Sequence, residues 1–243
     1  MTDKVYGLHA LEPLLAKHPE QIFQLVFCEG RLNARQQALL DLAMQVGVRT
    51  QRAPKKIFDQ LSGVHQGVYA EVAAQAAYTD ADLMDWVANN TNPLLVFLDE
   101  VQDPHNLGAI LRTADATGVT AVVVPKNNAA GLNATVRKVA CGGAESVPLV
   151  VVTNLVRTIE QLQQRGVWFT GLAGETEQTI YQADLTGPVA IVLGAEGKGL
   201  RPLTRKACDY LVAIPMQGQV SSLNVSVAAG VTLYEAIRQR QAV

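Results

Sequence analysis

The fold of this chain is decided by the segment Ile214-Pro215-Met216-Gln217-Gly218-Gln219-Val220-Ser221-Ser222-Leu223-Asn224-Val225-Ser226-Val227-Ala228-Ala229-Gly230. The apolar residues 210–214 predict a buried strand, Pro215 ends it, and the alternation of small and apolar residues from Asn224 predicts a C-terminal helix. The loop between them is longer than a plain strand-to-helix turn and carries groups suited to facing a ligand. A helix start that is merely capped by Ser222 or Asn224 explains this stretch alone equally well.

The composition is that of an ordinary globular chain. It has 243 residues, 49% of them hydrophobic and 17% charged, with a net charge of -2. This predicts one or two domains, and any nucleic-acid partner would be held by local basic patches and by shape. Three well-separated cysteines without CxxC spacing argue against a disulfide framework or a zinc site, so no metal is expected. Because we find neither a signal-peptide pattern nor a long apolar run, we expect a cytoplasmic protein with no membrane partner.

The first part of the chain, residues 1–72, is predicted to form a small α/β domain. Its predicted elements are helices at 9–17 and 33–46 and strands at 22–28, near 48 and near 68. Four cations without an intervening acid, Arg49, Arg52, Lys55 and Lys56, could touch a phosphate backbone, or could simply form a solvated face. Residues 73–92, rich in alanine and then in acids, are predicted to be a linker with a short helical piece.

From Pro93 to residue 243 apolar strands alternate with helical patterns, which predicts a mostly parallel sheet with helices on both faces. The predicted strands are 94–98, 121–124, 147–152, 167–172, 189–193 and 210–214. Asn106 and Asn154 are predicted to cap helices that end before Gly118 and Gly166.

Ligands of such sheets bind beyond the carboxyl ends of the strands, so the loops after residues 98, 172, 193 and 214 are the candidate site. The amide of Asn106 and the guanidinium of Arg112 are suited to gripping phosphate or ribose. In the glycine-rich segment 194–200, Lys198 is followed by Gly199, where a P-loop has Ser or Thr, so nucleoside triphosphate binding is not expected. No G-x-S-x-G motif is present, which argues against a serine hydrolase.

Three segments, taken together and in order, resemble the signature motifs of the SpoU (SPOUT) RNA 2′-O-ribose methyltransferases. They are Asn106-Leu107-Gly108 through Arg112-Thr113-Ala114, Leu193-Gly194-Ala195-Glu196-Gly197 with Gly199-Leu200, and Ile214-Pro215-Met216 through Ser222-Leu223-Asn224-Val225-Ser226. Tyr6-Gly7-Leu8-His9-Ala10 and His65-Gln66-Gly67 are similar to the N-terminal domain of the branch that methylates a guanosine ribose in 23S ribosomal RNA. The resemblance spans nearly the whole chain.

The resemblance implies an α/β fold in which the C-terminal domain is threaded as a trefoil knot and the N-terminal domain is a ribosomal-protein-like RNA-binding module. It also implies a homodimer through the knotted domain, with each site completed by its neighbour. S-adenosylmethionine would be held largely by backbone groups, and small and apolar residues agree with such a close approach. The corresponding positions are Leu172, Gly174, Leu193, Gly194, Gly199, Ile214, Met216 and Leu223.

Five further residues carry the catalytic roles that the resemblance implies. Arg112 would contact the target phosphate and help to deprotonate the hydroxyl, although a permanently charged guanidinium is better suited to electrostatic stabilisation. Asn106 would position the ribose and Glu196 would orient the residues of the first motif. Ser222 and Asn224 would shape the site around donor and acceptor.

The leading hypothesis is therefore S-adenosylmethionine-dependent 2′-O-methylation of a guanosine ribose in 23S ribosomal RNA, either as naked RNA or in a large-subunit assembly particle. One alternative keeps the chemistry and moves the substrate to transfer RNA. The other is a non-catalytic RNA-binding assembly factor, which the simultaneous presence of all five candidate catalytic residues disfavours.

Overall fold

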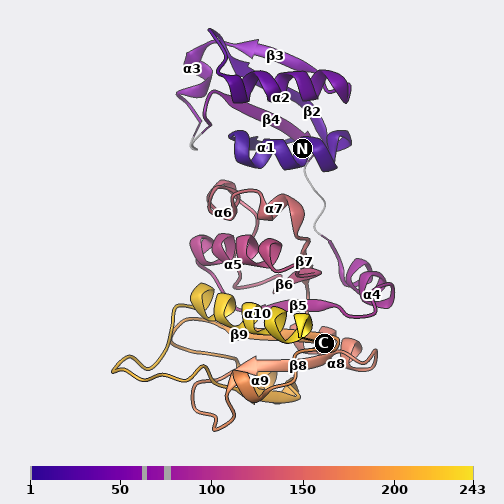
Figure 1. Cartoon of the computed structure of the whole chain (residues 1–243), viewed down its shortest axis with the longest axis vertical. Helices are drawn as coiled ribbons and strands as arrows, with labels where there is room; N and C mark the ends of the chain where they lie inside the picture. The colour runs from indigo at the N-terminus through magenta and orange to yellow at the C-terminus, as the bar shows by residue number, and fades with distance from the viewer. Residues whose placement is uncertain (1, 62–64, 74–77, 243) are drawn as a thin grey trace.

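The computed structural model describes residues 2–61, 65–73 and 78–242, and these form two separate β-sheets. The strand order is β1-β4-β2-β3 in the smaller sheet and β10-β8-β9-β5-β6-β7 in the larger one. Figure 1 shows the smaller sheet and its helices at one end of the molecule and the larger sheet at the other. Among the described residues, no helix combines the length and the apolar character needed to span a membrane.

In the smaller sheet, β4 pairs antiparallel with both β1 and β2, and β3 lies parallel to β2. Its strands are β1 (Thr2–Tyr6), β2 (Ile22–Cys28), β3 (Thr50–Ala53) and β4 (Val68–Ala73). Its helices are α1 (Leu8–Lys17), η1 (Pro19–Gln21), α2 (Ala34–Gln45) and α3 (Lys55–Phe58). Sequence reasoning missed β1, η1 and α3. β1 (sequence TDKVY) starts with three polar residues and shows no apolar run, and η1 and α3 are too short to show a clear periodicity.

Helix α4 (Asp80–Ala88) forms the helical piece expected between the two sheets. Leu83 and Val87 pack into the core beneath the larger sheet, and the Thr158 hydroxyl donates a hydrogen bond of 2.6 Å to the Asp80 carboxylate. α4 therefore packs with the larger sheet. The boundaries at residues 72 and 92 stay predictions, and residues 74–77 lie outside the described part of the chain.

All strand pairs of the larger sheet are parallel, as the alternation from Pro93 predicts. Its strands are β5 (Leu94–Asp99), β6 (Ala121–Pro125), β7 (Leu149–Val152), β8 (Trp168–Leu172), β9 (Val189–Gly194) and β10 (Tyr210–Val212). Helices cover both faces, which is why β5 is buried along its whole length. One face packs against α5 (Pro104–Ala116), α6 (Ala134–Ala140), α7 (Gly143–Ser146), η2 (Ile180–Gln182) and α10 (Val225–Gln241), and the other against α4, α8 (Leu155–Gln163) and α9 (Pro202–Ala207).

Two of the predicted details need correction. The N-cap of α5 is Asp103, whose carboxylate accepts from the His105 amide at 2.8 Å, with proline in the first turn. The prediction of Asn106 as the cap is wrong, because that side chain is buried in the first turn. β10 ends at Val212, since the Ala213 amide instead donates to the Gln178 carbonyl at 2.8 Å. The predicted Asn154 cap of α8 is confirmed.

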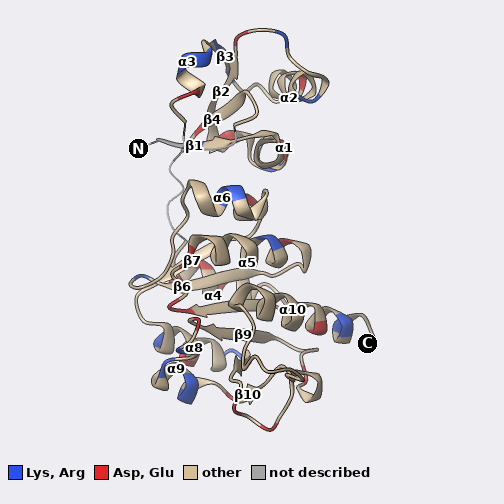
Figure 2. Cartoon of the chain, turned by 90° about the vertical axis from the view of Figure 1, so that its left-hand side faces the viewer, with Lys and Arg blue, Asp and Glu red and all other residues tan. Residues whose placement is uncertain are grey.

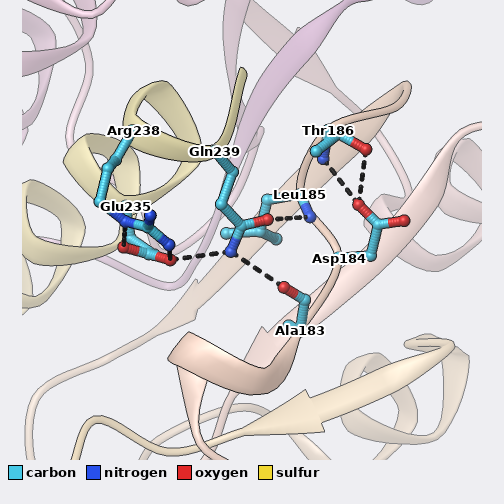
Figure 3. A network of polar contacts seen from close by, with 7 residues as sticks. All are labelled: Ala183, Asp184, Leu185, Thr186, Glu235, Arg238 and Gln239. Atoms are coloured by element: carbon cyan, nitrogen blue, oxygen red, sulfur yellow. Dashed lines mark hydrogen bonds and ion pairs between the residues drawn. The ribbon is translucent and has the colours of Figure 1, made fainter. Parts of the chain in front are cut away.

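The C-terminal helix is tied to the loop before β9 by polar side chains (Figure 3). The Gln239 amide accepts from the Leu185 backbone N–H at 2.9 Å and donates to the Ala183 carbonyl at 3.0 Å. At the next residue, the Arg240 guanidinium donates to four backbone carbonyls at 2.6 to 3.2 Å, those of Asn92, Pro93, Leu185 and Gly187. These bonds join α10 to the segments that enter β5 and β9.

We expect Arg240→Ala to lower the free energy of unfolding by about 2 to 3 kcal/mol, because hydrogen bonds from a charged donor are lost and carbonyls are left unpaired. Urea denaturation measures the change. Arg165→Ala is the matched control, since that guanidinium, just past the end of α8, donates to a single exposed carbonyl, that of Gln161. A change no larger than that of the control would contradict the structural role of Arg240.

Candidate active site

The carboxyl ends of the neighbouring strands β10, β8, β9 and β5 lie at one edge of the larger sheet, where the candidate residues gather. Leu172, Leu193 and Ile214 stand at or just beyond the ends of three of these strands. A Cβ atom added to Gly174 would lie 3.8 Å from the Ser221 carbonyl oxygen, so the loops after β8 and β10 run side by side. The structure thus brings three distant segments to one place.

The glycine-rich loop after β9 folds back on itself. The Gly199 amide donates to the Ala195 carbonyl at 2.8 Å, and both Gly197 and Gly199 have positive φ. A Cβ atom on Gly194 would lie 2.1 Å from the carbonyl carbon of Gly199. Because no side chain fits there, Gly194 is required for this tight turn.

The far end of the same loop is fastened to the end of β5. The fully buried Asp99 carboxylate accepts from the Arg201 backbone N–H at 2.8 Å and from its Nε at 2.6 Å. Arg201 also lies 3.5 Å from Glu100. The loop is therefore anchored at both ends, at Gly194 in β9 and at Arg201 beside β5.

Three candidate residues from separate segments form one hydrogen-bonded cluster, which we call the Asn-Glu-Asn cluster: Asn106, Glu196 and Asn224. The Asn106 amide donates to the Glu196 carboxylate at 3.1 Å and accepts from the Asn224 amide at 2.9 Å. Asn224 also donates to Glu196, and its oxygen accepts from the Ser226 amide at 2.9 Å. Asn224 is thus both the N-cap of α10 and a member of the cluster. The predicted capping role is confirmed, and a ligand-binding role for this stretch stays a prediction.

Arg112 lies apart from the Asn-Glu-Asn cluster. It is six residues beyond Asn106 on α5, which places it roughly 240° further around the helix. Its side chain is exposed, and Nη1 lies 3.7 Å from Sγ of Cys141. A Cβ atom on Gly143 would approach the Arg112 Cα to 3.0 Å, so the turn between α6 and α7 packs directly on this part of α5.

The remaining candidates differ in burial. Leu172 and Ile214 are half-buried and pack against the core, while Met216 and Leu223 are half-buried in the loop after β10. Ser222 is exposed in that loop. Among the described residues, no group of three or more His, Cys, Asp or Glu side chains is placed to hold a metal ion. Burial raises the pKa of Cys208 to about 12, so this thiol beside β8 stays protonated.

Sequence reasoning missed the ion pairs that support these loops. Besides Asp99 and Arg201, Arg137 on α6 binds Glu145 on α7 at 2.7 Å, and both side chains are largely buried. Burial raises the pKa of Glu145, although the ion pair with Arg137 acts in the opposite direction. An acid directly after an apolar strand is the only signal in the sequence that could have singled out Asp99.

The basic patch near the N-terminal end is exposed, and Figure 2 marks its lysines and arginines in blue around α3 and β3. Arg52 is partly engaged, since it donates to the carbonyls of Cys28 and Gly30. Lys55 and Lys56 occupy the first two positions of α3 and project cationic charge into solvent. This surface is thus available to a polyanion.

These features define an α/β protein whose candidate site lies at the carboxyl edge of a parallel sheet, and comparison with known proteins makes the class specific. The profile of the "SpoU rRNA Methylase family" matches residues 93–234, and that of "RNA 2'-O ribose methyltransferase substrate binding" matches residues 4–77. The chain belongs to the SpoU rRNA methylase family.

Similar proteins cover almost the entire chain. A Pseudomonas putida protein named 23S rRNA (guanosine-2'-O-)-methyltransferase RlmB is 55% identical over 241 residues, which are 98% of this chain and 97% of that protein. The Escherichia coli protein of the same name is 50% identical and covers 99% of this chain and 100% of its own. The crystal structure of the SpoU methyltransferase AviRb from Streptomyces viridochromogenes, in complex with AdoMet, is 26% identical, with a TM-score of 0.84 and coverage of 100% and 92%.

The anchor at Asp99 predicts an asymmetric effect of mutation. Arg201→Met should destabilise the protein by roughly 3 kcal/mol, because it leaves a buried carboxylate without its counter-charge. Asp99→Asn should cost only about 1 to 2 kcal/mol, since the partly exposed Arg201 can still reach water and Glu100. Urea unfolding at neutral pH measures the free energy of unfolding of both variants. The control is Lys198→Ala at an exposed position, whose free energy of unfolding should lie within about 0.5 kcal/mol of that of the parent. The reverse order would refute this account of the anchor.

Proposed function

We propose that this protein transfers the methyl group of S-adenosylmethionine to the 2′-oxygen of a guanosine ribose in 23S ribosomal RNA. The observation that carries the proposal is the meeting of Asn106, Glu196 and Asn224, from three distant segments, at the carboxyl edge of the sheet. Relatives that are 50 to 55% identical over nearly the full chain bear the name of this activity. Since the substrate is ribosomal RNA, the proposal places the protein in the bacterial cytoplasm.

The residues at the sheet edge fit the cofactor. The loops after β8, β9 and β10 offer backbone groups and small residues, and an added Cβ on Gly218 would meet no other atom within 4 Å. The residues that would hold S-adenosylmethionine are Leu172, Gly174, Leu193, Gly194, Gly199, Ile214, Met216 and Leu223. When bound, this cofactor supplies a methyl group already activated by its attachment to a sulfonium. The related AviRb has been solved with the same cofactor.

Because the donor is activated, the protein has mainly to align the ribose oxygen and assist the loss of its proton. Asn106 is buried and engaged at both ends of its amide, which favours a role in orienting Glu196 and Asn224. Ser222, exposed in the adjacent loop, would face donor and acceptor. Arg112 would bind the target phosphate and stabilise the negative charge that develops on the 2′-oxygen.

A homodimer would reconcile the position of Arg112 with this role. Within one chain, Arg112 faces the turn between α6 and α7, away from the Asn-Glu-Asn cluster. A partner subunit could place its own Arg112 at the cluster, as the family resemblance implies. Val227 and Tyr234 on α10, each more than half exposed, offer apolar surface for such a contact. Threading of the C-terminal segment as a trefoil knot belongs to the same proposal.

The proposed reaction is tested with purified protein, methyl-labelled S-adenosylmethionine and unmodified 23S ribosomal RNA. We expect label at one guanosine ribose, which then resists alkaline cleavage because the 2′-oxygen is blocked. Transfer RNA and a large-subunit assembly particle serve as parallel substrates. Label on transfer RNA alone would move the activity to the alternative substrate. Absence of both transfer and cofactor binding would favour a non-catalytic assembly factor.

Mixed dimers test the placement of Arg112. Arg112→Ala and Glu196→Ala should each lose nearly all turnover, while Arg112→Ala retains cofactor binding. When the two variants are refolded together, the mixture should show about a quarter of the parental rate. About half of the dimers are then mixed, and each mixed dimer has one intact site of its two. No recovery, with mixed dimers demonstrated by differential tags, would place Arg112 and Glu196 of the same chain in one site.

A further inference from the structure

A concave site separate from the Asn-Glu-Asn cluster lies between the two parts of the molecule, where α1 faces α6 (Figure 1). It is a cavity of about 220 Å³, and the residues that supply its chemistry are Tyr6, His9 and Gln66 on one side and Arg137, Lys138 and Cys141 on the other. The two sides touch, since a Cβ on Gly142 would lie 3.2 Å from the His9 carbonyl oxygen. Its volume is below the roughly 300 to 1,000 Å³ of pockets for drug-sized ligands, so it suits a single nucleobase.

The N-terminal wall is built by the two sequence motifs that the proposed reaction does not use. Gln66 from His65-Gln66-Gly67 accepts from the Leu8 amide at 3.0 Å, which fixes the start of α1. The Gln66 carbonyl in turn accepts from Gln36 at 2.7 Å. Gln66 is therefore occupied in holding the wall together, while Tyr6 and His9 are among the residues that line the cavity. The Tyr6 ring also packs beside the Tyr69 ring, and Nε2 of His9 lies 3.5 Å from the Arg35 guanidinium.

The opposite wall supplies positive charge. Arg137 is neutralised by Glu145, but the exposed Lys138 makes no side-chain ion pair or hydrogen bond within the described part of the chain. The acids on the helices that frame the cavity are already engaged: Glu12 of α1 binds Arg35, and Glu145 of α7 binds Arg137. An anion at Lys138 therefore meets no unpaired carboxylate from α1, α6 or α7.

The cavity leads directly to Arg112. Cys141 lines it, and the same thiol lies 3.7 Å from the Arg112 guanidinium. The cavity therefore has Lys138 in its lining and Arg112 beside its Cys141 thiol, with Tyr6 and His9 on the other wall. Single-stranded RNA is bound by this combination, in which cations follow the phosphates and splayed bases stack on aromatic side chains.

We propose that this cavity binds one unpaired nucleotide that flanks the methylated residue, with its base against Tyr6 and His9 and its phosphate on Lys138. The proposal rests on the proposed function, since it takes Arg112 to hold the phosphate of the target nucleotide. It assigns the N-terminal motifs a direct part in selecting the substrate, because the flanking base must be free to leave its stack. The cavity then sets which nucleotide reaches Arg112.

The test measures the dissociation constant for an unmodified 23S ribosomal RNA fragment, without cofactor, by fluorescence anisotropy. Tyr6→Ala should weaken binding about tenfold, because one base loses its stacking surface, whereas Tyr6→Phe should bind about as the parent does. Removing the base from the RNA at one flanking position should weaken binding to the parent protein by a similar factor. The same RNA should bind Tyr6→Ala no more weakly than the complete RNA does. The proposal is overturned if removing a base weakens RNA binding equally for the parent and for Tyr6→Ala at every flanking position. It is also overturned if Tyr6→Ala binds the complete RNA as tightly as the parent does.

Lys138→Ala is the second variant, chosen because an exposed lysine can be removed without disturbing the fold. It should weaken RNA binding several-fold and reduce the salt dependence by about one phosphate contact, whereas Lys206→Ala on α9 should change neither. Equal effects of the two lysine variants overturn the assignment of Lys138. These experiments measure RNA binding and not methyl transfer. If the parent protein did not methylate RNA, the proposed reaction would be refuted, but the binding results would still show whether the cavity binds a nucleotide.

Discussion

The buried carboxylate of Asp99 is the interaction on which the site depends. A buried charge is stable only when its oxygens are satisfied, and both oxygens of Asp99 are satisfied by Arg201, one through its backbone and one through its side chain. The bond can form only if the loop that begins at Gly194 returns to the end of β5. The stability of the central strand is thereby coupled to the closed shape of the glycine-rich loop. Glu196, within this loop, is held near α5 and α10 as a consequence.

The Asn-Glu-Asn cluster extends the same constraint to two helices. Asn106 lies in the first turn of α5 and Asn224 caps α10, so each amide is fixed by the helix that carries it. The single carboxylate of Glu196 accepts from both. A carboxylate near two helix N-termini is also favoured by their dipoles. The ligand-facing loops are thus ordered by interactions already present in the protein, which lowers the entropic cost of aligning two reactants.

Much of the larger sheet was predictable because β5, β6 and β9 are buried along almost their whole length and read as continuous apolar runs. The candidate residues were predictable only as members of motifs, and their meeting was not, because hydrogen bonds between residues 106, 196 and 224 leave no periodic trace in the sequence. Asn106 illustrates the limit. Its position near a helix start predicted a cap, but Asp103 followed by Pro104 is the stronger start signal, and Asn106 became free for a tertiary contact. β1 escaped because Thr2, Asp3 and Lys4 give it a polar start, and α3 because it has only four residues.

The distribution of charge explains how a chain with a net charge of -2 can still bind a polyanion. Figure 2 shows lysines and arginines next to one another on α3 and on α6. At physiological ionic strength the Debye length is about 8 Å, so an RNA phosphate senses the cations beside it and little of the acidic surface further away. Lys55 and Lys56 at one end and Lys138 near Arg112 are therefore effective locally, whatever the total charge. Weak global attraction also limits non-specific RNA binding, which leaves discrimination to shape and to the few bases that reach a pocket.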